Sequence, residues 1–252
     1  MEQPAMAYLD SEVVDPERAE WEIDLFFFQF DTSLLPGVVL AGILVAVFII
    51  YAFSGGMLDL AVSSQSIREG RIATLFTHMA AHAGLMHLWL NVTALVALSK
   101  VPIRRFGPGV RVLLAFAALL ILSGLTGGLL FLAINPYGTV PMVGASGAIC
   151  GLLGFAARLD PESPALVPLL SVRVGRALVD FARWNIVLFL ALYLLVSSSG
   201  GMGGLAWEAH LGGFAAGLLG APFFLGWASR GVHVEGEPPP RADGGVRDGL
   251  NP

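Results

Sequence analysis

Long apolar runs, separated by short polar and charged stretches, dominate the chain from residue 34 onward. A helix needs about 20 mostly apolar residues to cross a bilayer core that is about 30 Å thick. Six runs are candidates for such helices: about Leu34–Phe53, His82–Ser99, Val110–Ile134, Val143–Ala157, Trp184–Ser198 and Ala209–Ala228. The second, fourth and sixth carry the His, Asn, Ser and Gly residues that a lipid-facing helix would avoid, so we expect them to form the interior. The pattern predicts an all-α polytopic membrane protein, a bundle of six transmembrane helices.

Composition excludes several other classes of protein. Hydrophobic residues make up 56% of the chain and charged residues only 13%, and the mean hydropathy is +0.75. A soluble domain this apolar could not cover its surface with polar groups. The net charge of −5 and the absence of a long basic cluster argue against a nucleic-acid binder. The single cysteine, Cys150, excludes a disulfide framework and a cysteine-based metal site.

The chain divides into an acidic N-terminal segment (1–33), the helical bundle (34–229) and a tail (230–252) that we expect to be disordered. The acidic segment lacks the basic start of a signal peptide. Of the 14 Lys and Arg residues, 12 fall in alternate segments that include both chain ends. The positive-inside rule therefore predicts that both termini are cytoplasmic. Residues 54–76 are too mixed to cross a bilayer, and we expect them to lie in its outer interface.

Polar residues cluster at the start of the second predicted helix. His78, His82, His87 and Asn91 follow one another at spacings of 4, 5 and 4. On a helix, His87 and Asn91 lie one above the other on one face, where two donors could hold an anionic oxygen. The alternatives are that these side chains hydrogen-bond neighbouring helices, as most intramembrane His and Asn do, or that three histidines hold a metal ion. The absence of a nearby carboxylate weakens the metal reading.

Ser146 stands in the sequence Gly-Ala-Ser-Gly, where a loop turns into the fourth helix. The first N–H groups of a helix have no intrahelical acceptor, and they could stabilise the oxyanion that forms when a serine attacks a carbonyl. A serine here therefore suits a nucleophile. The alternative is that serine and glycine only allow close helix packing.

His210 begins a third cluster, on the sixth helix, and is followed by a Gly213-x-x-x-Gly217 face. Such a face packs closely on another small-residue face, and Gly147-x-x-x-Gly151 on the fourth helix is the natural partner. This packing would bring Ser146 near His210, the adjacent base that a serine nucleophile needs. We expect no carboxylate to orient His210, which predicts a Ser–His dyad. The nearest acidic residues are placed on the cytoplasmic side (Asp160, Glu162, Asp180) or in an external loop (Glu208).

These three clusters, in this order, resemble the rhomboid family of intramembrane serine proteases. The matching pieces are HMAAHAGLMHLWLN (78–91), GASG (144–147) and AHLGGFAAG (209–217), and the similarity extends from about Arg71 to Ala228. The resemblance implies a rhomboid-like bundle of the prokaryotic six-helix type in a cell membrane.

The resemblance also implies roles for residues. Ser146 would be the nucleophile and His210 the general base; His87 and Asn91 would join the Ser146 N–H in the oxyanion hole, and His82 would be structural support. Substrates would be single-span membrane proteins, cleaved within or just outside their transmembrane segment and surrounded by membrane lipid. No metal, organic cofactor or nucleic acid is expected.

The chain departs from the family pattern at two places. Many members carry an aromatic residue four positions after the serine, stacked on the imidazole; here it is Cys150, which predicts a less tightly held His210 ring. The Trp-Arg pair often found in the outer loop is replaced by Ala73 and Thr74, with Arg71 nearby. Two other functions compete with the protease. A transporter predicts ionisable residues along a pathway, and a non-enzymatic relative predicts loss of Ser146 or His210; the sequence shows neither.

Overall fold

The computed structural model describes residues 22–25, 28–54, 56–107, 109–198 and 205–228. Residues 1–21 and 26–27 of the predicted acidic segment therefore lie outside the described residues, and so does the whole of the tail (230–252) that was predicted to be disordered.

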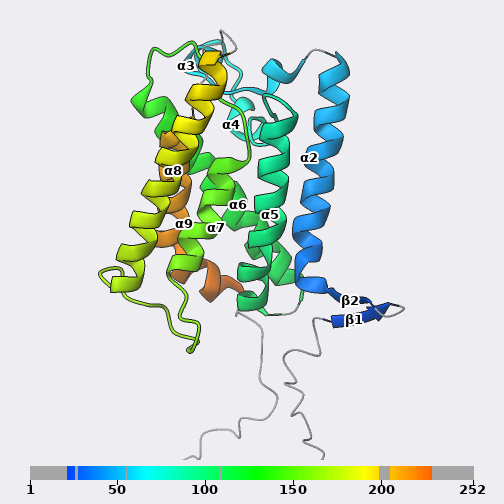
Figure 1. Cartoon of the computed structure of the whole chain (residues 1–252), viewed down its shortest axis with the longest axis vertical. Coiled ribbons are helices and arrows are strands. Elements are labelled where there is room, and N and C mark those ends of the chain that lie inside the picture. Colours follow the sequence, from blue (N-terminus) through cyan, green and yellow to red (C-terminus); the bar gives the residue numbers. More distant parts are fainter. Residues whose placement is uncertain (1–21, 26–27, 55, 108, 199–204, 229–252) are drawn as a thin grey trace, which may run out of the picture.

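In the described part of the chain, six apolar helices run side by side along the long axis of the molecule (Figure 1). They are α2 (Leu35–Ser54), α5 (Leu85–Phe106), α6 (Val110–Ile134), α7 (Ser146–Ala157), α8 (Val172–Ser198) and α9 (Trp207–Ala228). All except α7 are long and apolar enough to cross a membrane, and α7 is a shorter apolar helix. Large apolar side chains are exposed on their outer faces, whereas His82, Asn91 and His210 are buried. This inside-out pattern confirms the predicted helical membrane bundle.

Three predicted helix starts were wrong. α7 begins at Ser146 rather than Val143, because the residues before it form the turn at Gly144. α5 begins at Leu85 rather than His82, after Gly84, and continues beyond Ser99 to Phe106. α8 begins at Val172, twelve residues before the predicted start at Trp184. Hydropathy detects only the part of a helix that lies in lipid, whereas the hydrogen bonding of α8 also includes residues 172–183, a more polar stretch that contains three arginines.

A short hairpin that the sequence did not predict precedes α2. Strands β1 (Glu22–Leu25) and β2 (Phe28–Asp31) pair antiparallel and lead through the 3-10 turn η1 (Thr32–Leu34) into α2. Arg104, near the end of α5, donates to the Asp31 carboxylate at 2.5 Å. The hairpin therefore lies at the end of the bundle where α5 terminates (Figure 1).

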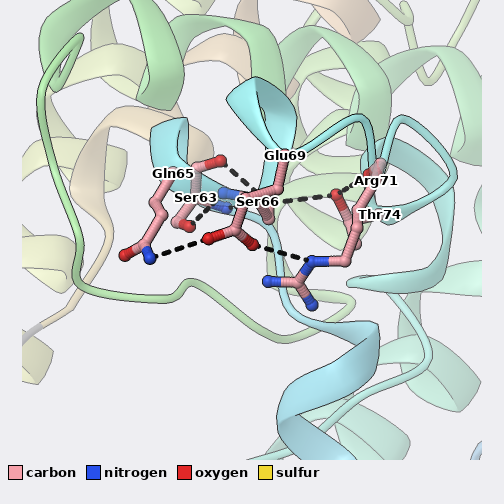
Figure 2. A network of polar contacts seen from close by, with 6 residues as sticks. All are labelled: Ser63, Gln65, Ser66, Glu69, Arg71 and Thr74. Carbon is pink, nitrogen blue, oxygen red and sulfur yellow. Dashed lines mark hydrogen bonds and ion pairs between the residues drawn. The ribbon is translucent and has the colours of Figure 1, made fainter.

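The segment between α2 and α5 lies at the opposite end of the bundle (Figure 1). It contains η2 (Met57–Leu60), α3 (Ser64–Arg68) and α4 (Thr74–Thr77). Between η2 and α3, the Val62 backbone exchanges hydrogen bonds of 3.0 and 2.8 Å with Met142, just before α7. Side chains within the segment form a network around a capping box at the start of α3, which Figure 2 shows: Ser63, Gln65, Ser66, Glu69, Arg71 and Thr74. The segment is thus a folded layer over one end of the bundle; its place in the membrane interface stays a prediction.

Close contact between α7 and α9 forms the centre of the bundle. A Cβ atom added at Gly213 would overlap the carbonyl oxygen of Gly147, and one added at Gly217 would overlap that of Gly151. The two predicted glycine faces therefore pack on each other, as expected. Only glycine permits this approach of two backbones.

α6 shares the interior, which the sequence did not predict. A Cβ atom added at Gly212 of α9 would lie 2.9 Å from the Cα atom of Gly127 in α6. α9 therefore has glycine contacts on two sides, toward α7 and toward α6. α5 is no more buried than α6, so the expectation that the second, fourth and sixth helices alone form the interior was incomplete.

Candidate active site

Ser146 is the first residue of α7 and is half-buried. Gly144, two residues before it, has a φ of +124°, a conformation that favours glycine. The Gly144 N–H donates to the His78 carbonyl oxygen at 2.9 Å, which fixes the turn that leads into the helix. Within the described residues the Ser146 hydroxyl makes no hydrogen bond to another residue. It stands beside the N–H groups of a helix start, as the sequence predicted.

His87 lies against this turn. A Cβ atom added at Gly144 would be 2.8 Å from both Cε1 and Nε2 of His87 and 3.6 Å from Oγ of Ser146. The missing side chain of Gly144 thus leaves the space in which the His87 ring approaches Ser146. The Ala83 N–H donates to Nδ1 of His87 at 3.4 Å. Because Nδ1 accepts, the neutral ring carries its hydrogen on Nε2, the atom nearer Gly144.

Asn91 follows His87 by one turn of α5 and is buried. Its amide nitrogen donates to the His87 carbonyl oxygen at 2.8 Å, and its Oδ1 has no partner among the described residues. The amide nitrogen carries a second hydrogen. His87 and Asn91 therefore share one helix face, as predicted, but only the His87 ring is seen beside Gly144.

His210 and Ser146 lie on contacting turns of α9 and α7. A Cβ atom added at Gly147, the neighbour of Ser146, would be 3.1 Å from the carbonyl oxygen of Ala209, the neighbour of His210. The glycine contact thus brings the two residues to one level of the bundle. The structure contains no hydrogen bond between them; such bonds often tighten only when substrate binds.

Asn185 of α8 is a polar neighbour of His210 that the sequence analysis missed. Its Oδ1 lies 2.6 Å from Nδ1 of His210, and its Nδ2 donates to the Phe181 carbonyl oxygen at 2.8 Å. The available signal was an asparagine within the apolar fifth run, next to Trp184. One helical turn away, the rings of Phe181 and Phe214 pack at 4.4 Å between centroids, so two successive turns of α8 and α9 are joined.

The other two histidines precede α5, so only His87 of the three clustered histidines shares a helix with Asn91. His82 is buried, its Nδ1 lies 3.2 Å from the Ala80 carbonyl oxygen, and its ring packs edge-on to that of His87 at 5.2 Å. His78 is buried at the end of α4, with Nδ1 3.0 Å from the Thr74 carbonyl oxygen. Burial lowers the pKa of the His78 imidazole below its usual value, and so favours the neutral ring.

Glu208 lies in the first turn of α9 and is buried, whereas the sequence placed it in an external loop. It accepts a hydrogen bond of 3.0 Å from the side chain of Asn135, which follows α6. The Asn135 carbonyl oxygen accepts from the Ser64 hydroxyl at 2.6 Å. A carboxylate is favourable at a helix N-terminus, which explains why the helix begins before Glu208. Within the described residues, the hydrogen-bonding partner of the His210 ring is the amide of Asn185 and not this carboxylate.

The two departures from the family pattern, in the outer loop near Arg71 and at Cys150, lie in different surroundings. Arg71 is exposed and forms an ion pair with Glu69 at 3.4 Å (Figure 2). Cys150 is buried in an apolar cluster with Phe214 and Leu218 of α9 and Val174 of α8. Among the described residues, no three His, Cys, Asp or Glu side chains lie close enough to hold a metal ion.

Two curated proteins are similar to this chain. RHOMBOID-like protein 5 of Arabidopsis thaliana is 28% identical over 168 residues, which cover 66% of this chain and 47% of that protein. Rhomboid protease GluP of Bacillus subtilis (strain 168) is 38% identical over 88 residues, which cover 35% of this chain and 16% of that protein. The chain thus spans less than half the length of both relatives.

A family model described as the Rhomboid domain matches residues 69–227. The match covers more than half of the chain and contains Ser146, His210, His87 and Asn91. Together with five helices that are able to span a bilayer, it identifies a multi-pass membrane protein. The chain belongs to the rhomboid family.

Proposed function

We propose that the protein is an intramembrane serine endopeptidase that cleaves transmembrane segments of single-span membrane proteins. The observation that carries the proposal is the contact between the start of α7 and α9, which sets Ser146 beside the turn that bears His210. The membership of the rhomboid family and the name of the Bacillus relative, a rhomboid protease, point to the same chemistry.

In the proposed reaction, Oγ of Ser146 attacks the scissile carbonyl carbon while its proton passes to Nε2 of His210. His210 then gives that proton to the leaving amine, and the acyl-enzyme forms. Water next attacks the ester, with His210 again taking and returning a proton, so that the carboxylic acid leaves and Ser146 is restored. A dyad is sufficient for each transfer because one imidazole both accepts and donates the proton.

The oxyanion formed in each step needs donors that are already in place. The Ser146 N–H at the helix start is one candidate, and Nε2–H of His87, which faces Gly144, is a second. The free hydrogen of the Asn91 amide is the third. The amide nitrogen donates one of its two hydrogens to the His87 carbonyl oxygen, and the other is the one proposed for the oxyanion.

The proposed setting is a cell membrane, with both termini in the cytoplasm and the chain surrounded by lipid. Thirteen arginines and one lysine favour a prokaryotic source. A substrate helix would reach Ser146 after residues of low helix propensity unwind it. Irregular backbone, such as the turn at Gly144, occurs at membrane depth only where it lines a cavity or is buried in protein.

The test is labelling of the purified protein in detergent with a fluorophosphonate probe. We expect labelling of the wild type and none of Ser146→Ala or His210→Ala, while Ser163→Ala, in an exposed loop, labels like the wild type. The same four proteins are then reconstituted with a single-span substrate, and cleavage is followed by mass spectrometry. We expect the wild type and Ser163→Ala to cleave the substrate, and Ser146→Ala and His210→Ala not to cleave it. Full cleavage by Ser146→Ala would disprove the dyad. A folded wild type that neither labels nor cleaves would favour a non-enzymatic membrane-binding function.

A further inference from the structure

A chain of two hydrogen bonds joins the backbone of α8 to the imidazole of His210. Nδ2 of Asn185 donates to the Phe181 carbonyl oxygen at 2.8 Å, and Oδ1 of Asn185 lies 2.6 Å from Nδ1 of His210. His210 is buried and Asn185 is half-buried, so water competes little for the bond between them.

The polarity of this chain is set at its backbone end. A carbonyl oxygen only accepts hydrogen bonds, so the NH2 group of Asn185 has to face Phe181. A flipped amide would put two acceptor oxygens in contact there, and would turn donor hydrogens toward His210. With the amide held this way, Oδ1 faces the imidazole and only accepts. Nδ1 of His210 therefore carries a hydrogen.

A neutral imidazole has one N–H, so a hydrogen on Nδ1 leaves the lone pair on Nε2. Nε2 is the atom that takes the serine proton in the proposed reaction. His87 is held in the opposite tautomer, because its Nδ1 accepts from the Ala83 N–H. The two rings near Ser146 thus have complementary forms: one presents a donor and the other a base.

We propose that Asn185 is the positioning residue of the His210 base: from α8 it holds the ring in the Nδ1–H tautomer and fixes its orientation. This inference rests on the proposed protease function and deepens it. It also gives the His210 ring a support that does not depend on an aromatic residue at position 150, where this chain has a cysteine packed into the neighbouring apolar cluster.

The placement of Asn185 on α8 has a further consequence. No residue of α8 after Asn185 whose side chain the structure describes is buried, while Val174 and the Phe181–Phe214 pair hold the first half of the helix. Asn185 thus lies where the first half of α8 meets a half in which no described side chain is buried. Displacement of the turn of α8 that carries Asn185 would remove the partner of His210.

The experiment compares Asn185→Leu, Asn185→Asp and a control, Leu190→Ala, on the exposed part of α8. Leucine has the same number of side-chain heavy atoms as asparagine and the same branching at Cγ, but no acceptor. Aspartate keeps an acceptor oxygen for Nδ1–H, and its second oxygen replaces the NH2 group that donates to the Phe181 carbonyl oxygen. We expect Asn185→Leu to lower kcat roughly 10-fold to 100-fold with little change in KM, since KM reports substrate binding. The kcat of Asn185→Asp should stay within about 10-fold of the wild-type value. The kcat of Leu190→Ala should equal the wild-type value.

The tautomer is read separately by 15N NMR of histidine-labelled protein, with the His210 signals assigned from a His210→Gln sample. The wild type and Asn185→Asp should show a protonated Nδ1 and an unprotonated Nε2, and Asn185→Leu should lose that signature while it unfolds at the temperature of the wild type. An unchanged kcat or an unchanged tautomer in Asn185→Leu would overturn the inference.

The spectrum also separates this inference from the proposed function, because it requires no protease activity. A wild type without activity but with the Nδ1–H signature, lost in Asn185→Leu, would contradict the protease and support the contact. An active wild type whose Asn185→Leu variant keeps the wild-type kcat would show that position 185 only fills space, and would contradict the positioning role.

Discussion

Gly213 of α9 packs directly on Gly147 of α7, so closely that a Cβ atom on Gly213 would overlap the Gly147 carbonyl oxygen. The obstacle is backbone, which cannot rotate away as a side chain can. The distance between the two helices, and with it the distance between Ser146 and His210, is therefore set by the absence of two methyl groups.

Gly213→Ala should separate α9 from α7 and abolish activity. We expect it to destabilise the fold by about 1–3 kcal/mol, the usual cost of overpacking. Thermal unfolding in detergent and fluorophosphonate labelling measure the two effects. Gly226→Ala is the matched control in the same helix, because a Cβ atom there meets nothing within 4 Å. Equal unfolding temperatures for the two variants would contradict the packing argument.

Gly144→Ala should reduce activity more than stability. Its φ of +124° makes an L-residue strained, at a cost of about 1–3 kcal/mol, and the added Cβ would press on the His87 ring. We expect slower probe labelling at Ser146, because the ring moves from the place where it could donate. Gly84→Ala, at an extended glycine with open space around it, provides the comparison. Wild-type labelling by Gly144→Ala would remove His87 from the proposed oxyanion hole.

Asn91→Ala should lower kcat and leave KM nearly unchanged, because an oxyanion donor acts mainly in the transition state. One such donor is worth at most roughly 3–4 kcal/mol, so activity should fall without disappearing. Steady-state cleavage of a reconstituted single-span substrate measures both constants. Leu90→Ala, at the preceding and more exposed position of α5, should behave like the wild type. A kcat equal to that of Leu90→Ala would exclude Asn91 from the hole.

His78 should make the fold sensitive to acid. Burial lowers the pKa of its imidazole in the folded protein, whereas the unfolded chain has a value of about 6.5. Above that pH the ring is neutral in both states and its full contribution to stability is present. As the pH falls below it, the unfolded state binds the proton first, and stability declines until the pH reaches the lowered pKa.

The measurement is the unfolding temperature in detergent between pH 7.5 and pH 5, for the wild type and for His78→Gln. Glutamine can still donate to the Thr74 carbonyl oxygen but does not titrate in this range. We expect a shallower decline for the variant. Parallel curves would show that His78 contributes nothing to the acid sensitivity.

Cys150 should react slowly with maleimide in the native protein, because its thiol is buried among residues of α7, α8 and α9. It is the only cysteine of the chain, so it reports on the packing of α8 without engineering. Phe181→Ala removes the ring that packs on Phe214 and should accelerate the reaction by roughly 10-fold or more. Phe189→Ala, on the exposed half of α8, should leave the rate unchanged. The same rate in all three proteins would show that α8 does not cover the thiol.

The apolar runs and the spacing of small residues along the sequence were sufficient to predict much of this helical bundle. A run of about 20 apolar residues has few folds open to it in a bilayer, so the positions of α2, α6 and α9 were nearly correct from hydropathy alone. The contact between the Gly147 and Gly213 faces could also be predicted, because small residues one turn apart mark where helices approach. The type and order of the residues further indicated Ser146, His210, His87 and Asn91, whose catalytic roles stay predictions.

Other features depend on how helices rotate about their axes and where a chain leaves the membrane. The pairing of Asn185 with His210 joins residues 25 positions apart, and hydropathy does not report which face of α8 turns inward. The early start of α8 at Val172 lies where hydrogen bonding continues without an apolar run, and the apolar residues of the hairpin before α2 are too few to form a membrane helix. Hydropathy indicates which segments are able to enter a membrane, since transfer into lipid is a property of each segment. Which polar groups meet inside the bundle follows from tertiary packing, because a buried donor takes whatever acceptor the neighbouring helices present.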